Sequence, residues 1–160
     1  MAGRRPSRSA TGPEPTRGPA SPFDGKRILT SDGILHLDGL PRSLAVVGAG
    51  VVGCEYASIL ATLGVRVTLV DQRNRLLPFV DDEVAAELCH QLLESRVTLR
   101  LGESVNRLEG VATDTGERVL LHLDSVQTIL AAQALSSVGR TGATRQTTLA
   151  APVIEPAHHA

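Results

Sequence analysis

The feature that most constrains the fold is a glycine pattern at residues 44–53. Leu44-Ala-Val-Val-Gly-Ala-Gly-Val-Val-Gly53 is a short apolar run that ends in G-x-G-x-x-G and passes directly into a helical sequence. This order predicts a buried parallel strand that turns tightly into a helix whose amino end faces a dinucleotide diphosphate. We expect Gly48 to form the turn, Gly50 to let the phosphates approach the backbone, and Gly53 to let the helix pack closely on the strand.

The residues after the third glycine support this interpretation. Apolar residues recur at helical spacing at Tyr56, Ile59, Leu60 and Leu63. Gly64 then ends the helix in a C-cap role, and residues 66–70 alternate as a second strand. That strand leads into Asp71, 21 residues after Gly50, where such folds place the acid that accepts hydrogen bonds from the adenosine ribose. The alternative, a glycine-rich turn that binds nothing, is disfavoured by the strand, helix and acid together.

Composition limits the fold class and the partners. The chain has 160 residues, 42% of them hydrophobic, and a formal net charge of −1, which is typical of a globular protein with one domain. Aromatic residues make up only 2%, and no basic stripe is present in the central region, so we expect no nucleic-acid partner. No stretch is long and apolar enough to span a membrane. Cys54 and Cys89 lack C-x-x-C spacing, so we interpret them as reduced packing residues of a cytoplasmic protein, with no metal site.

A second helix and a third strand follow Asp71. Residues 72–75 form a polar loop, and the acids at 81–83 crowd the start of the next helix, where negative charge suits the helix dipole. The apolar residues expected on the inner face of this helix are Val84, Leu88 and Leu92. Residues 97–101 are a third strand, which completes a βαβαβ unit. The predicted fold class is therefore α/β, with a Rossmann-like parallel sheet.

Short strands follow, and they indicate a β-meander. We expect strands over 104–108, 118–123 and 128–130, and a strand over 134–138 that returns to the parallel sheet. Residues 124–127 offer no glycine for a tight hairpin, so that turn is expected to be longer or strained.

The ends of the chain are predicted to be flexible. Residues 1–21 are rich in Arg, Pro, Ser and Gly and are expected to be disordered; the alternative, a transit peptide, lacks the apolar face that such a helix needs. Residues 22–43 are an extended lead-in with a turn at Asp24-Gly25 and a short helix capped by Thr30 or Ser31. The dinucleotide-binding domain is expected to span 44–140, and 141–160 to be a solvated tail.

Residues 40–58 closely resemble the nicotinamide-nucleotide domain of the FAD-dependent pyridine nucleotide-disulfide oxidoreductase family. Within that family the stretch is most similar to soluble pyridine nucleotide transhydrogenases, and next to dihydrolipoamide dehydrogenases. Supporting segments are 22–25, 31–35, 73–79 and 137–140, so the resemblance covers residues 22–140. Ala10-Thr-Gly12 also resembles the strand that precedes this domain in the family.

The resemblance implies hydride transfer between NAD(H) or NADP(H) and a bound FAD, and, in a transhydrogenase, between the two nicotinamide pools. In the family the flavin lies on a separate amino-terminal domain with its own glycine fingerprint, and a carboxy-terminal domain forms the dimer. This chain has one fingerprint and lacks the redox Cys pair of the disulfide reductases. We therefore expect no FAD site in this chain and assign it no catalytic residue.

The resemblance also assigns residues to the dinucleotide. They are Gly48, Ala49, Gly50, Val51, Val52, Gly53, Glu55, Asp71, Gln72, Arg73 and Gly139. Glu55 matches an acid near the nicotinamide carboxamide, or is an ordinary acid in an early helical turn. Arg73 meets a 2′-phosphate that Asp71 would repel, or is a solvated loop residue, so the choice between NAD and NADP stays open. Gly139 matches a glycine that lets the backbone approach the nicotinamide.

Three hypotheses follow for function. The leading one is a nucleotide-binding domain of a flavin-dependent NAD(P) oxidoreductase of the transhydrogenase type, which in isolation binds the dinucleotide and transfers no hydride. A second is one half of a split enzyme that docks on a flavin-carrying subunit or forms a homodimer, through an exposed apolar face. A third is a decayed remnant with no selected role, which the altered turn at Val126-Gln127 would fit.

Overall fold

The computed structural model describes residues 13–15 and 23–142. The strands in this part are β1 (Pro13–Pro15), β2 (Ile28–Thr30), β3 (Ser43–Val47), β4 (Arg66–Asp71), β5 (Thr98–Leu101), β6 (Val105–Thr113), β7 (Gly116–Leu123), β8 (Thr128–Ala131), β9 (Gln133–Ser136) and β10 (Arg140–Gly142). The helices are α1 (Val51–Thr62) and α2 (Asp82–Glu94), with a short 3₁₀ helix η1 (Gly33–His36).

The centre of the fold is a five-stranded parallel sheet in the order β2-β9-β3-β4-β5. Its β3, β4 and β5 strands are linked by α1 and α2, so the predicted βαβαβ unit is confirmed. Buried aliphatic residues fill both faces of β3 and β4, as expected of strands covered on two sides. The chain runs outward from β3 to β5 and then returns to the other side of β3 through β9. This reversal of direction beside β3 creates a crevice at the carboxyl ends of the strands.

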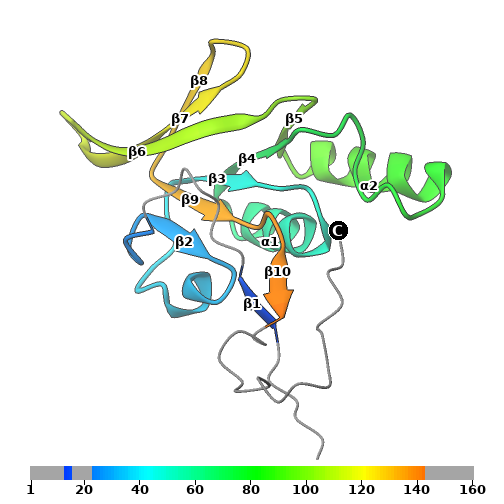
Figure 1. Ribbon diagram of the computed structural model, residues 1–160, viewed down its shortest axis with the longest axis horizontal. Coiled ribbons are helices and arrows are strands. Elements are labelled where there is room, and N and C mark those ends of the chain that lie inside the picture. The colour runs from blue at the N-terminus through cyan, green and yellow to red at the C-terminus, as the bar shows by residue number, and fades with distance from the viewer. Residues whose placement is uncertain (1–12, 16–22, 143–160) are drawn as a thin grey trace, which may run out of the picture. The chain divides into compact units, whose positions relative to one another are not determined.

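Different layers cover the two faces of this sheet (Figure 1). Leu44 and Val46 point into a core shared with α1 and α2, whereas Ala45 points to the opposite face. There Ala45 and its cross-strand neighbour Ala134 pack against the antiparallel sheet β6-β7-β8. The small side chains let the second sheet approach closely, and this sheet forms the predicted meander.

The buried helix faces differ in part from the sequence pattern. On α1 the buried residues are Gly53, Cys54, Ala57 and Leu60, while Ile59 and Leu63 are more than half exposed. Small residues face the sheet because the Gly53 contact holds the helix close to it. On α2, Leu92 is buried and Leu88 packs against the core, but Val84 is exposed and Ala85 takes its place. The prediction of an inward-facing Val84 is wrong.

Several helix and strand boundaries also differ from those predicted from the sequence. The lead-in contributes β2 to the parallel sheet, and the predicted short helix is the single 3₁₀ turn η1, whose Gly33 N–H donates to Thr30 Oγ1 at 3.1 Å. The β6 strand continues past residue 108 because it pairs with β7 as far as Thr113. The β9 strand ends at Ser136, two residues earlier than expected. The turn at 124–127 is strained as predicted, with Val126 at a φ of +66°.

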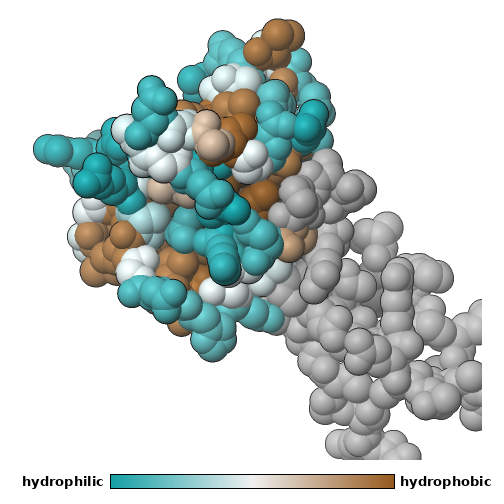
Figure 2. Space-filling view, turned by 90° about the vertical axis from the view of Figure 1, so that its left-hand side faces the viewer, coloured by the Kyte–Doolittle hydropathy of each residue, from teal (hydrophilic) through white to brown (hydrophobic). Residues whose placement is uncertain are grey.

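The described parts of the predicted flexible ends contain a small sheet. Pro13–Pro15 and Arg140–Gly142 form the two strands β1 and β10 of a separate sheet, so residues 13–15 of the predicted leader and 141–142 of the predicted tail lie in strands. The rest of the leader, the Ala10-Thr-Gly12 match, and the tail beyond residue 142 lie outside the described residues. On the face shown in Figure 2, hydrophilic side chains alternate with small apolar patches rather than surrounding one continuous apolar surface.

Candidate functional site: the crevice at the glycine turn

The glycine turn joins β3 to α1, and its three glycines meet different surroundings. Gly48 has a φ of +106°, and a Cβ there would lie 2.8 Å from the Ser137 carbonyl oxygen. A Cβ on Gly53 would lie 1.8 Å from the Gly48 carbonyl oxygen. Both glycines are therefore required for packing within the chain. A Cβ on Gly50 would meet nothing within 4 Å, so its outer face is open.

The amino end of α1 has no side-chain cap. Its N-cap is Gly50, and the first helical hydrogen bond runs from Cys54 N–H to the Gly50 carbonyl at 2.9 Å. The N–H groups of residues 51–53 precede that bond, so they have no partner within the helix. In α2, by contrast, the Asp81 carboxylate accepts a hydrogen bond from Glu83 N–H at 2.9 Å. The first turn of α1 is therefore suited to hold an anion.

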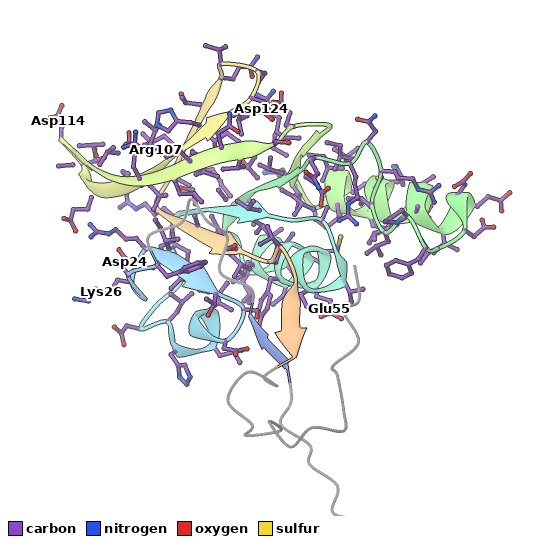
Figure 3. All side chains as sticks on the ribbon, in the orientation of Figure 1. Asp24, Lys26, Glu55, Arg107, Asp114 and Asp124 are labelled. Atoms are coloured by element: carbon purple, nitrogen blue, oxygen red, sulfur yellow. The ribbon has the colours of Figure 1, made fainter. Side chains whose placement is uncertain are left out.

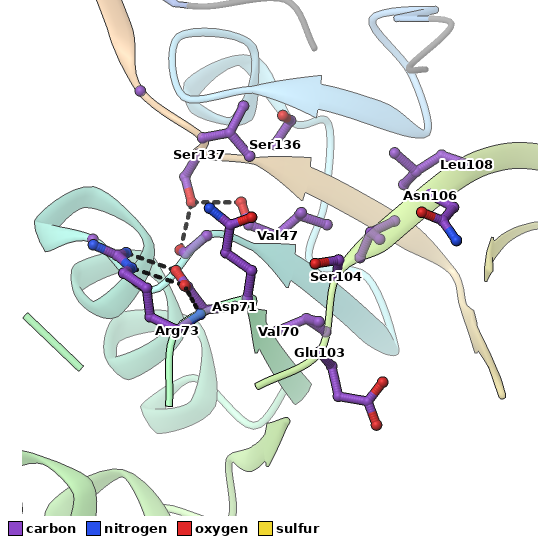
Figure 4. Close-up of a pocket in the computed structure, with 16 residues that line it drawn as sticks. Val47, Val70, Asp71, Arg73, Glu103, Ser104, Asn106, Leu108, Ser136 and Ser137 are labelled. Atoms are coloured by element: carbon purple, nitrogen blue, oxygen red, sulfur yellow. Dashed lines mark hydrogen bonds and ion pairs between the residues drawn. The ribbon is translucent and has the colours of Figure 1, made fainter. Parts of the chain in front are cut away.

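A cavity of about 680 Å³ lies at the carboxyl ends of β3, β4 and β9 and is bordered by the start of β6. This volume lies within the range of about 300–1,000 Å³ found for small-molecule and cofactor sites. Figure 4 shows Asp71 and Arg73 on one side of it, and Asn106 and Leu108 on the other. The cavity lies where open α/β sheets bind ligands, at the point where the strand order reverses.

Asp71 and Arg73 form a closed pair on one wall of the cavity (Figure 4). Arg73 donates from Nε to Asp71 Oδ1 at 2.8 Å and from Nη2 to Oδ2 at 2.7 Å. The backbone N–H groups of Arg73 and Ala49 donate to the same carboxylate at 2.8 and 2.5 Å. Burial alone would raise the pKa of Asp71, but these hydrogen bonds outweigh it and hold the pKa below its ordinary value.

The structure brings six of the sequence-predicted residues to the cavity. They are Gly48, Gly50, Asp71, Gln72, Arg73 and Gly139. Ala49 is buried and held by Asp71, while Val51, Val52 and Gly53 form the first turn of α1 beside the cavity lining. Glu55 is exposed on α1 and does not line the cavity (Figure 3).

The residues that sequence reasoning missed come from later strands. Ser104 and Asn106 at the start of β6, and Ser136 at the end of β9, also line the cavity. Ser137 holds the turn directly, since its hydroxyl lies 2.9 Å from the Val47 carbonyl oxygen and 2.8 Å from that of Gly48. Their positions in the sequence could have identified them, because residues at the carboxyl ends of parallel strands meet at one edge of a sheet.

The described residues also bear on three other features: a metal site, a reactive thiol and a membrane-spanning helix. Among residues 13–15 and 23–142, no group of His, Cys, Asp or Glu side chains is arranged to hold a metal ion. Burial raises the pKa of the Cys54 thiol to about 11, which makes it a poor nucleophile at neutral pH. Neither α-helix of the described ranges has the length and apolarity needed to cross a bilayer.

The fold and the glycine turn define a Rossmann-like α/β protein, and comparison with known proteins narrows the class. The family model described as pyridine nucleotide-disulphide oxidoreductase matches residues 9–153. The chain belongs to this family.

Among curated proteins, soluble pyridine nucleotide transhydrogenases from Azotobacter vinelandii and Pseudomonas fluorescens (strain Pf0-1) are each 47% identical to this chain. The matches cover 84% and 86% of this chain, but only 28% and 29% of those proteins. The chain therefore spans less than a third of the length of the curated relatives it matches.

Solved structures give the same class. LpdA from Mycobacterium tuberculosis is 33% identical with a TM-score of 0.77, and the match covers 87% of this chain and 29% of that one. The HOCl-induced flavoprotein disulfide reductase RclA from Escherichia coli is 26% identical with a TM-score of 0.75, over 84% and 30% of the two chains. The resemblance stated from the sequence is confirmed.

Proposed function

We propose that this chain binds NAD(H) or NADP(H) as the nicotinamide-nucleotide domain of a flavin-dependent oxidoreductase of the transhydrogenase type. The observation that carries the proposal is the uncapped amino end of α1, which lies next to the open face of Gly50 and the cavity. Family membership and the transhydrogenase relatives support the choice of ligand.

The roles of this chain's residues are to bind and orient. The N–H groups of residues 51–53 hold the diphosphate, with help from the helix dipole. Gly139, at a φ of +125°, gives the nicotinamide half of the ligand access to the backbone at the end of β9. The adenosine half of the dinucleotide lies beside the Asp71–Arg73 pair. When bound together, the nicotinamide and a flavin supply the hydride chemistry, and the protein supplies position and electrostatics.

Isothermal titration of the full chain with NADPH, NADH and FAD in separate runs tests the proposal. We expect one nicotinamide dinucleotide bound per chain and no heat of binding with FAD. A folded chain, checked by circular dichroism, that binds neither nicotinamide dinucleotide would contradict the proposal. Purification of a yellow protein with stoichiometric FAD and NADPH-dependent diaphorase activity would overturn the view that this chain has no flavin site.

A second observation favours a partner protein. Val51 and Ile59 on α1 and Leu63 at its C-cap follow one outer row and are 48%, 54% and 55% exposed, with the exposed Glu55 between Val51 and Ile59. The opposite face of the helix is buried in the core. Large apolar side chains exposed together on one helix face, among polar residues, are typical of a surface that a partner covers. We propose that this stripe docks on a flavin-carrying polypeptide, since RclA, a solved relative of the family, is a flavoprotein disulfide reductase.

Co-purification tests the docking proposal. The wild-type chain is expected to retain a flavoprotein during purification from its native cells, and the double variant Ile59→Lys/Leu63→Lys is expected to lose it while keeping its circular dichroism spectrum. Val84→Lys/Leu93→Lys, at exposed positions on α2, is the matched control and should retain the flavoprotein. A wild-type chain that purifies as a monodisperse monomer without a flavoprotein would contradict docking.

A further inference from the structure

The Asp71 carboxylate, expected from the sequence to hold the adenosine ribose, already has a full set of donors. Its Oδ1 accepts from the backbone N–H and the Nε–H of Arg73, and its Oδ2 accepts from Ala49 N–H and Arg73 Nη2–H. An ionised carboxylate has about four acceptor positions. Ribose hydroxyls therefore reach Asp71 only if they displace Arg73.

Displacing Arg73 is unfavourable because the pair is both charged and sheltered. The Asp71 side chain is 4% exposed, and exchange of the guanidinium for neutral ribose hydroxyls would leave a buried carboxylate without its charged partner. The same carboxylate holds the Ala49 N–H in place inside the glycine turn. The hydrogen bonds from Arg73 thus occupy the acceptor positions on Asp71 to which the hydroxyls of an unphosphorylated ribose would donate.

Arg73 keeps donors for an anion while it is paired. A guanidinium has five N–H groups, and Asp71 accepts from one on Nε and one on Nη2. The remaining three have no partner in the described part of the chain; the side chain is 41% exposed and lines the cavity. Their forked geometry matches a phosphate group. Since the two paired charges offset each other, Asp71 no longer repels such a group strongly.

We propose that the Asp71–Arg73 pair makes this site selective for dinucleotides that carry a phosphate on the adenosine 2′-oxygen, so that NADP(H) is preferred over NAD(H). This inference rests on the proposed function and specifies the ligand of the same site. Arg73 is the specificity-determining residue: it binds the 2′-phosphate and withholds Asp71 from the 2′-hydroxyl of the competing ligand.

Two small probes isolate the 2′-phosphate. Adenosine 2′,5′-bisphosphate and adenosine 5′-monophosphate differ only in that group, and both are titrated calorimetrically into the full chain. The wild type should bind the bisphosphate about ten- to hundredfold more tightly, as expected when charged hydrogen bonds are gained. Arg73→Ala should abolish this difference, and its affinity for the monophosphate should be unchanged or higher, because Arg73 no longer occupies the acceptor positions on Asp71.

Arg75→Ala is the matched control. Arg75 lies two residues further on, pairs with Asp82 at 2.5 Å and donates to the Val80 carbonyl at 2.9 Å, and it does not line the cavity. The substitution removes the same charge, so it should preserve the preference for the bisphosphate. Thermal unfolding of each variant verifies that it is folded.

The outcomes separate the two proposals. Equal binding of both probes by the wild type, or equal losses in Arg73→Ala and Arg75→Ala, would overturn the selectivity and leave dinucleotide binding intact. Failure of the folded wild type to bind either probe, NADH or NADPH would instead overturn the proposed function.

Discussion

At the scale of single residues, Val126 has an unfavourable backbone conformation. Its φ is +66° and its side chain is 94% exposed, so the β-branched residue gains little from packing. Glycine adopts this conformation without the Cβ penalty. We expect Val126→Gly to raise the free energy of unfolding by about 0.5–1 kcal/mol, measured by urea denaturation.

The neighbouring substitution Asp124→Gly is the control for Val126→Gly. Asp124 lies in the same turn but has no positive φ, so glycine there adds only chain flexibility and should lower stability. Stabilisation by both variants, or by neither, would contradict the assignment of strain to Val126.

The lowered pKa of the Asp71 carboxyl predicts how the stability of the protein depends on pH. Its pKa in the folded protein is held below the ordinary value of 3.8 by Arg73 and Ala49 N–H, which outweigh burial. Its stabilising contribution is therefore complete above the unfolded-state pKa and is lost as the pH falls through the folded-state pKa. Asp71→Asn should lower the free energy of unfolding by about 1–3 kcal/mol at pH 7. In urea titrations this difference should shrink below pH 4, whereas a constant difference would contradict the account.

At the scale of elements, the approach of α1 to β3 depends on Gly53. Because a Cβ there would lie 1.8 Å from the Gly48 carbonyl oxygen, Gly53→Ala forces the helix away from the turn. We expect a loss of about 3 kcal/mol or more in the free energy of unfolding, since backbone atoms cannot move aside as a flexible side chain does. Gly110→Ala in β6, where a Cβ meets nothing within 4 Å, should change stability by less than about 0.5 kcal/mol. Similar effects for the two variants would contradict this packing account.

The elements that the sequence predicted correctly are those with strong local signals. Apolar strands ended by glycine or an acid identified β3 and β4, and the acids at 81–83 marked the start of α2. The errors came from tertiary context. Ala85 replaces Val84 on the inner face of α2, and β2 is too short to reveal that it pairs with β9. Pairing with β7, rather than local propensity, sets the length of β6.

At the scale of the whole molecule, only the part of the candidate site built by one βαβ unit could be predicted from the sequence. The glycine turn and Asp71 flank a single helix and strand, so their proximity follows from one βαβ unit. Ser104 and Asn106 reach the cavity only because the antiparallel sheet packs on the parallel one. The engagement of Asp71 by Arg73 depends on side-chain geometry that spacing does not encode.

The central claim is that the α1 amino end holds a dinucleotide diphosphate against Gly50, and Gly50→Ala tests it most directly. At Gly50 the φ is −77° and a new Cβ meets no protein atom within 4 Å, so the melting temperature should stay within about 2 °C of wild type. The added methyl group would occupy the approach of the phosphates. Calorimetric titration with NADPH should therefore show an affinity at least about tenfold lower than wild type, a loss of roughly 1.4 kcal/mol. NADPH bound as tightly by a folded Gly50→Ala variant as by the wild type would contradict the claim.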